Sequence, residues 1–330
     1  MQVAAPVIVD AHLHLLPTLR DGYTGWQNMR PVGLGKLAFE TASGANRSLR
    51  WFPPLMEDCT FKVETAIEYM DWLGIDKAVV VQCSGYGIFD DYCVECLHRY
   101  PDRFVIHCTL NPAHGPEAVD YLERCVRGRG FSGVNLHPGA EFKTGGYFLN
   151  DPAVMPFWEK AAELEVPVTV HLSLPGLNRY AHQVAQLAEV AERFPDLPII
   201  LDHLGVPSFE EQEPYPLHQE TCSLAQFPSV YMTISALPFH SHCEFPYPDA
   251  GPLIRMAYEA FGAPRLMWAS DAPSVLRICT YHQTLAYVRA LEFLSEWDKR
   301  WIFGHTALNV MCFPGASTQD GSSLLFKHIR

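Results

Sequence analysis

Short apolar runs rich in β-branched residues recur along the chain at fairly even spacing. Near-continuous apolar runs are typical of strands that are covered on both faces, as in parallel sheets. Eight such runs are present: VIVDAH from Val7, KAVVVQ from Lys77, FVIHCTL from Phe104, FSGVNLH from Phe131, PVTVHL from Pro167, PIILDHL from Pro198, SVYMTIS from Ser229 and RLMWASD from Arg265. We therefore predict eight buried strands.

Amphipathic helical patterns lie between most of these runs. Residues 61–73, FKVETAIEYMDWL, have apolar positions at i, i+3 and i+4 and are followed by Gly74, a residue that commonly ends helices. Similar segments begin near Asp90, Pro116, Pro152, Tyr180, Pro252 and Thr280. Strand and helix alternating eight times predict an α/β fold, a closed (β/α)8 TIM barrel. The connection between the sixth and seventh strands is the weakest part of this prediction, because EEQEPYPLHQ contains prolines.

Two segments depart from a minimal barrel. Residues 15–60 form a long insertion after the first strand, and loops of that length are usually functional. Aromatic residues such as Trp26, Trp51 and Phe52 predict an ordered lid over the mouth of the barrel. The Gly/Ser-rich tail, residues 314–330, is expected to be loosely attached. We therefore expect one barrel domain over residues 1–313, with the lid insertion at 15–60.

Charge and cysteine content narrow the class of protein. A formal charge of −13 argues against a nucleic-acid partner, because nucleic-acid binding needs a basic face. No apolar run reaches about 18 residues, so no membrane span is expected. The start, MQVAAPVIVD, lacks the features of a secretory leader, and we expect a cytoplasmic protein with its ten cysteines reduced. The single CxxC, Cys93 and Cys96, has no second pair with which to form a zinc site and is interpreted as packed on a helix.

The first predicted strand carries two histidines two residues apart, in Asp10-Ala11-His12-Leu13-His14. Side chains alternate along a strand, so both imidazoles face the same side, with Cα atoms about 6.5 Å apart. Two ring nitrogens at that spacing can meet one ion at roughly 2.1 Å. This pair alone is weak evidence, because histidines at strand ends are often simple polar rim residues.

Three further strands close with a residue of the same kind: the fifth with His171, the sixth with His203 and the eighth with Asp271. The carboxyl ends of the strands form the face where barrel enzymes keep their catalysts. Four strands converging on one rim predict a metal or catalytic site. Its expected ligands are His12, His14, His171 and Asp271, which would hold Zn²⁺ or a similar ion with room for an activated water. Asp271 is expected to carry the proton, and His203 to polarise a carbonyl or act as acid or base.

The motifs VDAHLH, GVNLHP, VTVHLS, LDHLG and WASDAP, with IFGHTALNVM near the end, resemble those of the amidohydrolase superfamily. The chain is most similar to the amidohydrolase-related branch, which includes aminocarboxymuconate-semialdehyde decarboxylase, γ-resorcylate decarboxylase and pyrone-dicarboxylate lactonase. The resemblance spans about Val7 to Met311 and implies a (β/α)8 barrel with one divalent metal, Zn²⁺ or alternatively Mn²⁺. It implies the same four ligands, with His203 catalytic. Where dinuclear branches carry a carboxylated lysine in strand four, this chain has Asn135 and His137, which favours one metal over two.

Further residues are expected on the substrate side of the site. They are Trp51, Tyr86, Asn135, His137 and Arg179. An arginine grips a carboxylate best, through its guanidinium fork. A turn-stabilising role for His137 and a plain loop role for Tyr86 are equally good interpretations. The second HxH, His240 and His242, stands in a proline-rich loop and is interpreted as lining the pocket rather than ligating.

The function predicted is metal-dependent hydrolysis of a small, carboxylated or cyclic amide, ester or lactone by a metal-activated water. The alternative is metal-dependent, non-oxidative decarboxylation of an aromatic or dienoic acid, in which Asp271 protonates carbon and no water attacks. A third reading, an inactive barrel that binds a ligand, is disfavoured because every expected ligand position is filled. The expected partner is a small-molecule substrate, and the exposed loops are compatible with a homodimer.

Overall fold

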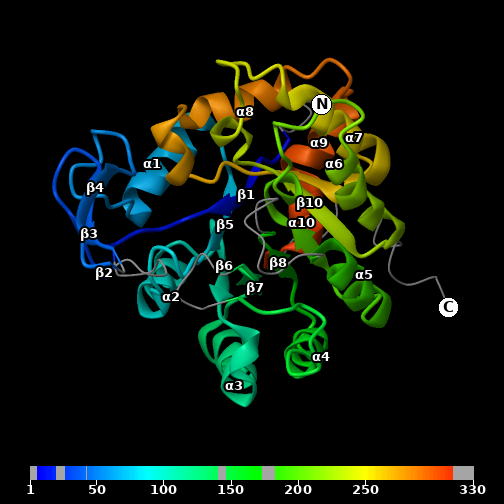
Figure 1. Ribbon diagram of the computed structural model, residues 1–330, viewed down its shortest axis with the longest axis horizontal. Helices are drawn as coiled ribbons and strands as arrows, with labels where there is room; N and C mark the ends of the chain where they lie inside the picture. The colour runs from blue at the N-terminus through cyan, green and yellow to red at the C-terminus, as the bar shows by residue number, and fades with distance from the viewer. Residues whose placement is uncertain (1–5, 20–26, 42, 140–145, 173–182, 315–330) are drawn as a thin grey trace.

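The computed structural model describes residues 6–19, 27–41, 43–139, 146–172 and 183–314, and within them eight parallel strands form one sheet (Figure 1). Their order is β1 (Val9–Leu13), β5 (Lys77–Val81), β6 (Phe104–Thr109), β7 (Gly133–Leu136), β8 (Val168–Val170), β9 (Ile199–Leu201), β10 (Val230–Ile234) and β11 (Leu266–Trp268). A parallel bridge between Leu13 of β1 and Ala272, which follows β11, brings the two edges of the sheet together. The (β/α)8 barrel and its eight predicted strands are therefore confirmed.

Helices follow the strands around the outside of the barrel (Figure 1). They are α1 (Val63–Leu73), α2 (Asp90–Arg99), α3 (Pro116–Glu123), α4 (Met155–Glu163), α5 (Gln183–Arg193), α6 (Pro216–Cys222), α7 (Ala250–Phe261), α8 (Tyr281–Arg289), α9 (Glu296–Arg300) and α10 (Thr306–Val310). Helix α1 ends at Gly74 as predicted, with the glycine in the left-handed conformation. The segment between β9 and β10 forms α6 in spite of its prolines, because Pro216 stands in the first turn of the helix, where an amide hydrogen is not needed.

The inside of the barrel is divided into an apolar layer and a polar layer. Alternate strand residues, such as Val79, Val105 and Met267, form a buried cluster with Ala307 and Met311 at α10. Just before α10, a Cβ on Gly304 would lie 2.1 Å from the carbonyl oxygen of Val7, so this segment packs against the start of β1. The amino-terminal end of the barrel is thus filled, and the polar strand ends lie at the opposite end.

An irregularity in β1 decides which of its side chains face that polar layer. The register with β5 shifts between Asp10 and Leu13, which indicates a bulge. Asp10 accepts hydrogen bonds from Tyr281 of α8 and from the Ser270 amide, on the outer side of the strand. His12 instead contacts Asp202, across the barrel at the end of β9. The bulge therefore separates a structural carboxylate from the histidine two residues later.

The insertion after β1 contains a three-stranded antiparallel sheet, β2 (Gln27–Pro31), β3 (Lys36–Glu40) and β4 (Asn46–Arg50), at one side of the barrel (Figure 1). Its two ends meet in an antiparallel bridge between Leu16 and Phe61, with hydrogen bonds of 2.8 and 2.9 Å. Gly35 has a φ of +69° and lies so close to the Phe52 carbonyl that a side chain would collide with it. The segment is thus a folded unit with a closed neck; its role as a lid stays a prediction.

The structure bears on the predictions about membrane spans and cysteines. No helix in the described ranges has the length and apolar character needed to cross a membrane. All ten cysteines are free thiols, as predicted. Residues 315–330 of the predicted tail lie outside the described residues.

Candidate metal centre

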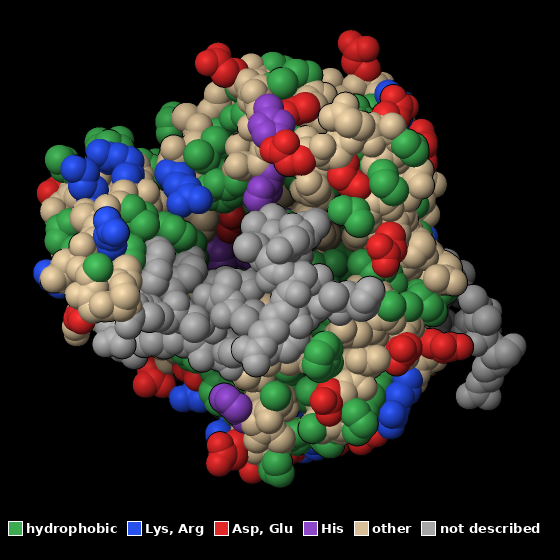
Figure 2. Space-filling view, viewed as in Figure 1, with side chains coloured by type: hydrophobic (Ala, Val, Ile, Leu, Met, Phe, Trp, Pro, Cys, Tyr) green, Lys and Arg blue, Asp and Glu red, His purple; other side chains and the backbone are tan. Residues whose placement is uncertain are grey.

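A pocket of about 340 Å³ opens at the carboxyl ends of the strands. Figure 2 shows the hollow, with histidine side chains at its edge and inside it. The residues that line it come from strand ends all around the barrel and from the insertion: His12, His14, Trp51, Cys83, Tyr86, His137, His171, His203, Val206, Ala236, Phe239, His240, Asp271, Ser274 and Arg277. Its volume is at the lower end of the range for ligand sites, which fits a small molecule.

His12 is held by a carboxylate behind it. Its Nδ1 atom lies 2.7 Å from Oδ2 of Asp202, and both side chains are buried. Burial alone lowers the pKa of His12, but the attraction and hydrogen bond of Asp202 outweigh it and raise the pKa to about 9. The carboxylate also holds the proton on Nδ1, so Nε2 is the ring nitrogen that faces the pocket.

His14 presents its Nε2 atom to the same point. Its Nδ1 lies 2.7 Å from the Val81 carbonyl oxygen, which can only accept a hydrogen bond, so Nδ1 carries the proton. The backbone of Asp271 is tied to β1 by a 3.0 Å hydrogen bond from its amide to the His12 carbonyl. Asp271 also has a φ of +58°, a left-handed conformation that is costly for a non-glycine residue. These contacts hold its carboxylate against the two imidazoles.

The three ligand atoms are close enough to share one ion. Nε2 of His12 lies 3.1 Å from Nε2 of His14, and the Asp271 carboxylate oxygen lies 3.8 Å from the His12 nitrogen and 3.2 Å from the His14 nitrogen. Two ligands of one zinc ion, each at about 2.1 Å, can be no more than about 4.2 Å apart. Two lone pairs that face each other at 3.1 Å repel unless a positive charge lies between them. A proton can supply that charge, and the donor set also fits a divalent cation.

His203 forms the next part of the same wall. Its Nδ1 atom lies 2.7 Å from the Ser235 hydroxyl, and burial lowers its pKa, so the ring is neutral at pH 7. Burial raises the pKa of Asp202, but the charge of His12 and its hydrogen bond outweigh this effect and hold the pKa well below its usual value. Thr233 donates a 2.7 Å hydrogen bond to Asp202. Sequence reasoning assigned no role to Asp202, although the Asp-His pair at the end of β9 was a visible signal.

His171, the fourth predicted ligand, lines the pocket but lies farther from this point. Among the described residues two groups have ligand atoms within 4.8 Å of one another, His12 with His14 and Asp271, and His12 with Asp202 and His203. His171 belongs to neither group. Its ring centre is 4.8 Å from that of His203 and 5.3 Å from that of His137, so it lies beside these two rings.

The structure places only some of the predicted substrate-side residues at the pocket. Trp51, Tyr86 and His137 line the pocket. Asn135 is fully buried in β7, donates to the Gln82 carbonyl and is not among the lining residues. Arg179 lies outside the described residues.

The second HxH separates into two different environments. His240 lines the pocket. His242 is more than half exposed and lies 3.2 Å from Glu210. Both histidines lie outside the two groups with metal-ligand spacing that the described residues form.

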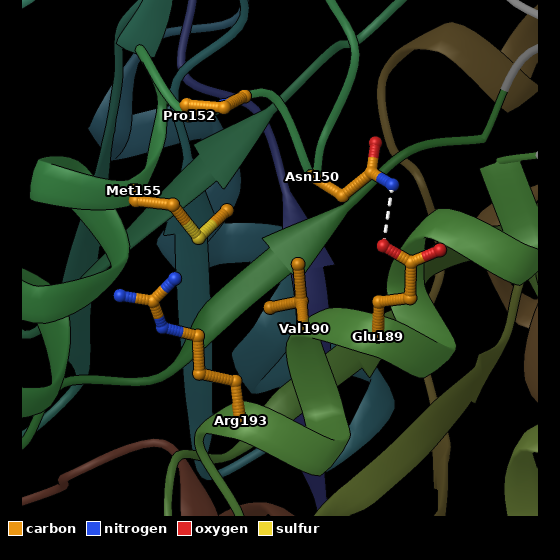
Figure 3. Close-up of a pocket in the computed structure, with 6 residues that line it drawn as sticks. All are labelled: Asn150, Pro152, Met155, Glu189, Val190 and Arg193. Atoms are coloured by element: carbon orange, nitrogen blue, oxygen red, sulfur yellow. Dashed lines mark hydrogen bonds between the residues drawn. The ribbon is translucent and has the colours of Figure 1, made fainter.

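A second groove, of about 360 Å³, lies on the outside of the barrel near α4 and α5. Figure 3 shows that Asn150 and Glu189 face each other in it, joined by a 2.6 Å hydrogen bond. Arg193, at the other end of the groove, is paired with Glu159 at 2.9 Å. Its polar groups are therefore already satisfied by one another, and it contains no cluster of reactive side chains.

A family model for amidohydrolases matches residues 9–310. A curated relative, L-fucono-1,5-lactonase of Burkholderia ambifaria, is 30% identical over 205 residues, which are 61% of this chain. The matched region spans 66% of the lactonase, slightly less than two thirds of that protein.

Solved structures share the fold across nearly the whole chain. A probable 2-pyrone-4,6-dicarboxylic acid hydrolase from Acinetobacter baumannii, with citric acid bound, has a TM-score of 0.67 at 18% identity and covers 92% of this chain and 98% of its own. An amidohydrolase from Burkholderia multivorans with bound zinc has a TM-score of 0.63 at 16% identity, with coverage of 93% and 100%. At such identities the likeness shows the fold alone.

Proposed function

The chain belongs to the amidohydrolase family, and from that premise we propose that it is a metal-dependent hydrolase of a small ester, lactone or amide. The observation that carries the proposal is the meeting of two imidazole nitrogens and a carboxylate oxygen within 3.1 to 3.8 Å at the floor of the pocket. The lactonase and the pyrone-dicarboxylate hydrolase among its relatives support hydrolysis of a cyclic ester.

His12, His14 and Asp271 would hold one divalent ion, with His171, whose ring lies beside that of His203, as the proposed fourth ligand. Zinc is the ion proposed, because two or three imidazoles with a carboxylate are a zinc donor set, and a related structure contains zinc. When bound, such an ion acts as a Lewis acid and lowers the pKa of a water toward neutrality. Asp202 completes the arrangement, since a carboxylate behind a ligating histidine fixes the ring and strengthens its basicity.

The chain's own residues move the protons in this proposal. Asp271 accepts a proton from the attacking water and returns it to the leaving oxygen or nitrogen. His203 is neutral, and when the Ser235 hydroxyl donates to its Nδ1 atom, its Nε2 atom carries the proton. In that tautomer His203 can donate a hydrogen bond to the carbonyl oxygen as negative charge develops on it.

The pocket also contains a thiol, Cys83, but its environment does not suit a nucleophile. Burial raises the pKa of Cys83 to about 12, so the sulfur is protonated at neutral pH. The Cys83 sulfur accepts a 3.4 Å hydrogen bond from the Gly85 amide, and Nε2 of His137 lies 3.7 Å from it. Attack by a water is therefore the better-supported chemistry.

The test is to remove metal with a chelator, reload the protein with Zn²⁺ or Mn²⁺, and measure ring opening of simple δ-lactones by acid release. We expect chelation to lower activity at least about 100-fold and reloading to restore it. Asp271→Asn should lower kcat at least about 100-fold. Asp298→Asn, at a buried capping carboxylate of α9, is the matched control and should keep its activity.

Two outcomes would contradict the proposal. Full activity after complete removal of metal would eliminate the metal-dependent mechanism. Release of CO₂ from aromatic or dienoic acids, without lactone or ester cleavage, would assign the chain to decarboxylation instead.

A further inference from the structure

An arginine that the sequence analysis did not single out stands among the residues lining the pocket. Arg277 lies in a 3₁₀ turn, Ser274–Arg277, that follows Asp271. Its side chain is exposed, and among the described residues its guanidinium has neither a hydrogen bond nor an ion pair. Five other arginines of the described chain, Arg99, Arg103, Arg127, Arg129 and Arg193, are paired with carboxylates.

Two aromatic rings hold the guanidinium in place. Its central carbon is 4.7 Å from the centre of the Trp51 ring and 4.6 Å from that of Phe239, and both rings line the same pocket. Contact with two aromatic rings restricts the position of a guanidinium and leaves its N–H donors available. Five donors fixed in this way suit a bidentate contact with a planar anion.

Trp51 is itself fixed on the barrel side of the pocket. Its indole hydrogen-bonds to the Tyr86 hydroxyl, which in turn lies 2.7 Å from the Ser274 hydroxyl. Ser274 begins the turn that ends at Arg277. The insertion, the loop after β5 and the turn after β11 therefore share one set of contacts around this guanidinium, which limits its movement.

The net negative charge of the protein makes the positive charge of Arg277 at the pocket unusual. The protein has a formal charge of −13, which repels small anions on average. Figure 2 shows Lys and Arg side chains on the insertion side of the hollow, against a surface with many acidic groups elsewhere. Arg277 thus places an unpaired positive charge at the pocket of an acidic protein, and an anionic group on the substrate would be its partner.

We propose that Arg277, held between Trp51 and Phe239, binds a carboxylate of the substrate and makes the enzyme selective for small carboxylate-bearing substrates. The kinetic part of this inference rests on the proposed hydrolytic function. The two rings enclose the guanidinium and the neighbouring part of the substrate, and the carboxylate lies along the open edge of the fork. Arg277 determines specificity and takes no part in bond cleavage.

The test compares two lactones that share a ring, 6-oxooxane-2-carboxylate and neutral δ-valerolactone, with zinc-loaded protein. Arg277→Met should raise KM for the carboxylated lactone about 10- to 100-fold, the loss of one charge-assisted contact, and leave the neutral lactone nearly unchanged. Arg277→Lys, which keeps the charge without the fork, should give a smaller increase. Arg255→Met is the matched control. Arg255 is also exposed, and its guanidinium carbon lies 4.2 Å from the centre of the Phe293 ring, in a different part of the surface from the pocket.

A purely structural role for Arg277, as a clamp for Trp51, predicts equal losses on both lactones, and that result would overturn the proposal. An unchanged KM for the carboxylated lactone in Arg277→Met would overturn it as well. Melting temperatures of the variants identify any that fail to fold, and Arg277→Lys then gives the same comparison.

A binding measurement separates this proposal from the proposed reaction. If the wild-type protein opens neither lactone, the hydrolytic function fails, and calorimetry with the open-chain products decides the role of Arg277. Arg277→Met should then bind 2-hydroxyadipate at least about 10-fold more weakly, and the control Arg255→Met should bind it as tightly as the wild type does. Equal affinity of wild type and variant for 2-hydroxyadipate would refute carboxylate binding.

Discussion

The protonation of two histidines is set by what lies behind each ring. Asp202 holds the Nδ1 proton of His12, and the Val81 carbonyl holds that of His14. Both Nε2 atoms are thereby turned to a common point before any ligand arrives. Such outer partners commonly change metal affinity by 10- to 100-fold when they are removed.

Asp202→Asn should therefore weaken zinc binding about 10- to 100-fold, because the amide lacks the charge that favours the Nδ1–H form of His12. Competition with a chromogenic chelator measures the affinity. Asp298→Asn is the matched control, since its buried carboxylate caps a helix remote in sequence from the ligands. Equal zinc affinities in wild type and Asp202→Asn would show that the contact has no role in holding the ion.

Among single residues, the sequence pointed to the candidate ligands but not to the residues that contact them from behind or across the pocket. Two-residue spacing in a strand is enough to place His12 and His14 on one side. The partners Asp202 and Arg277 depend on contacts across the barrel, Asp202 with β1 and Arg277 with Trp51 of the insertion. Such contacts are made in three dimensions and leave no local pattern.

Among the elements, β7 shows how closely the barrel interior is packed. A Cβ on Gly133 would lie 2.4 to 2.7 Å from three atoms of the His107 ring, which is fully buried in β6. The backbone conformation of this glycine is an ordinary one for a strand, so the restriction is purely steric. The His107 ring of β6 thus fills the space next to Gly133 inside the barrel.

Gly133→Ala should destabilise the protein by about 1–3 kcal/mol, because overpacking displaces the His107 ring. Chemical denaturation gives the change in the free energy of unfolding. Gly128→Ala is the control, since nothing lies within 4 Å of a Cβ at that position. Adding His107→Ala to Gly133→Ala should recover part of the loss; no recovery would mean that the strain lies elsewhere.

The secondary-structure elements also have features that a local sequence pattern cannot predict. The positions of the strands and helices could be predicted from the pattern of apolar residues. Parallel strands that are covered on both faces, for example, need nearly continuous apolar sequences. The bulge in β1 separates Asp10 from His12 although both occupy the same phase of the alternation. A bulge depends on pairing with β5, and the insertion's sheet depends on pairing within a segment that reads as an irregular loop.

For the molecule as a whole, the buried histidines link folding to pH. His218 on α6 is almost fully buried, and its Nε2 atom donates to the Leu253 carbonyl at 3.0 Å. Burial lowers its pKa below the ordinary value of about 6.5. As pH falls through 6.5, the unfolded chain therefore takes up this proton before the folded protein does.

The contribution of His218 to stability is thus complete above about pH 6.5 and decreases as the solution becomes more acidic. Between pH 6.5 and 5 the free energy of unfolding of His218→Gln should fall less steeply than that of the wild type. The slopes of the unfolding free energy against pH differ between the two proteins by at most about 1.4 kcal/mol per pH unit. Denaturation at several pH values measures it, with the same substitution at exposed His282 as control. Equal pH slopes for wild type and His218→Gln would contradict the assignment.

The proposed chemistry depends on a divalent ion held by His12, His14 and Asp271. Anomalous diffraction at the zinc edge, from crystals of zinc-loaded protein, tests it most directly. We predict one strong peak in the pocket, about 2.0–2.2 Å from Nε2 of both histidines and from a carboxylate oxygen of Asp271. The same map shows whether His171 is a ligand. A pocket without a peak after loading, or a peak that contacts none of the three residues, would contradict the claim.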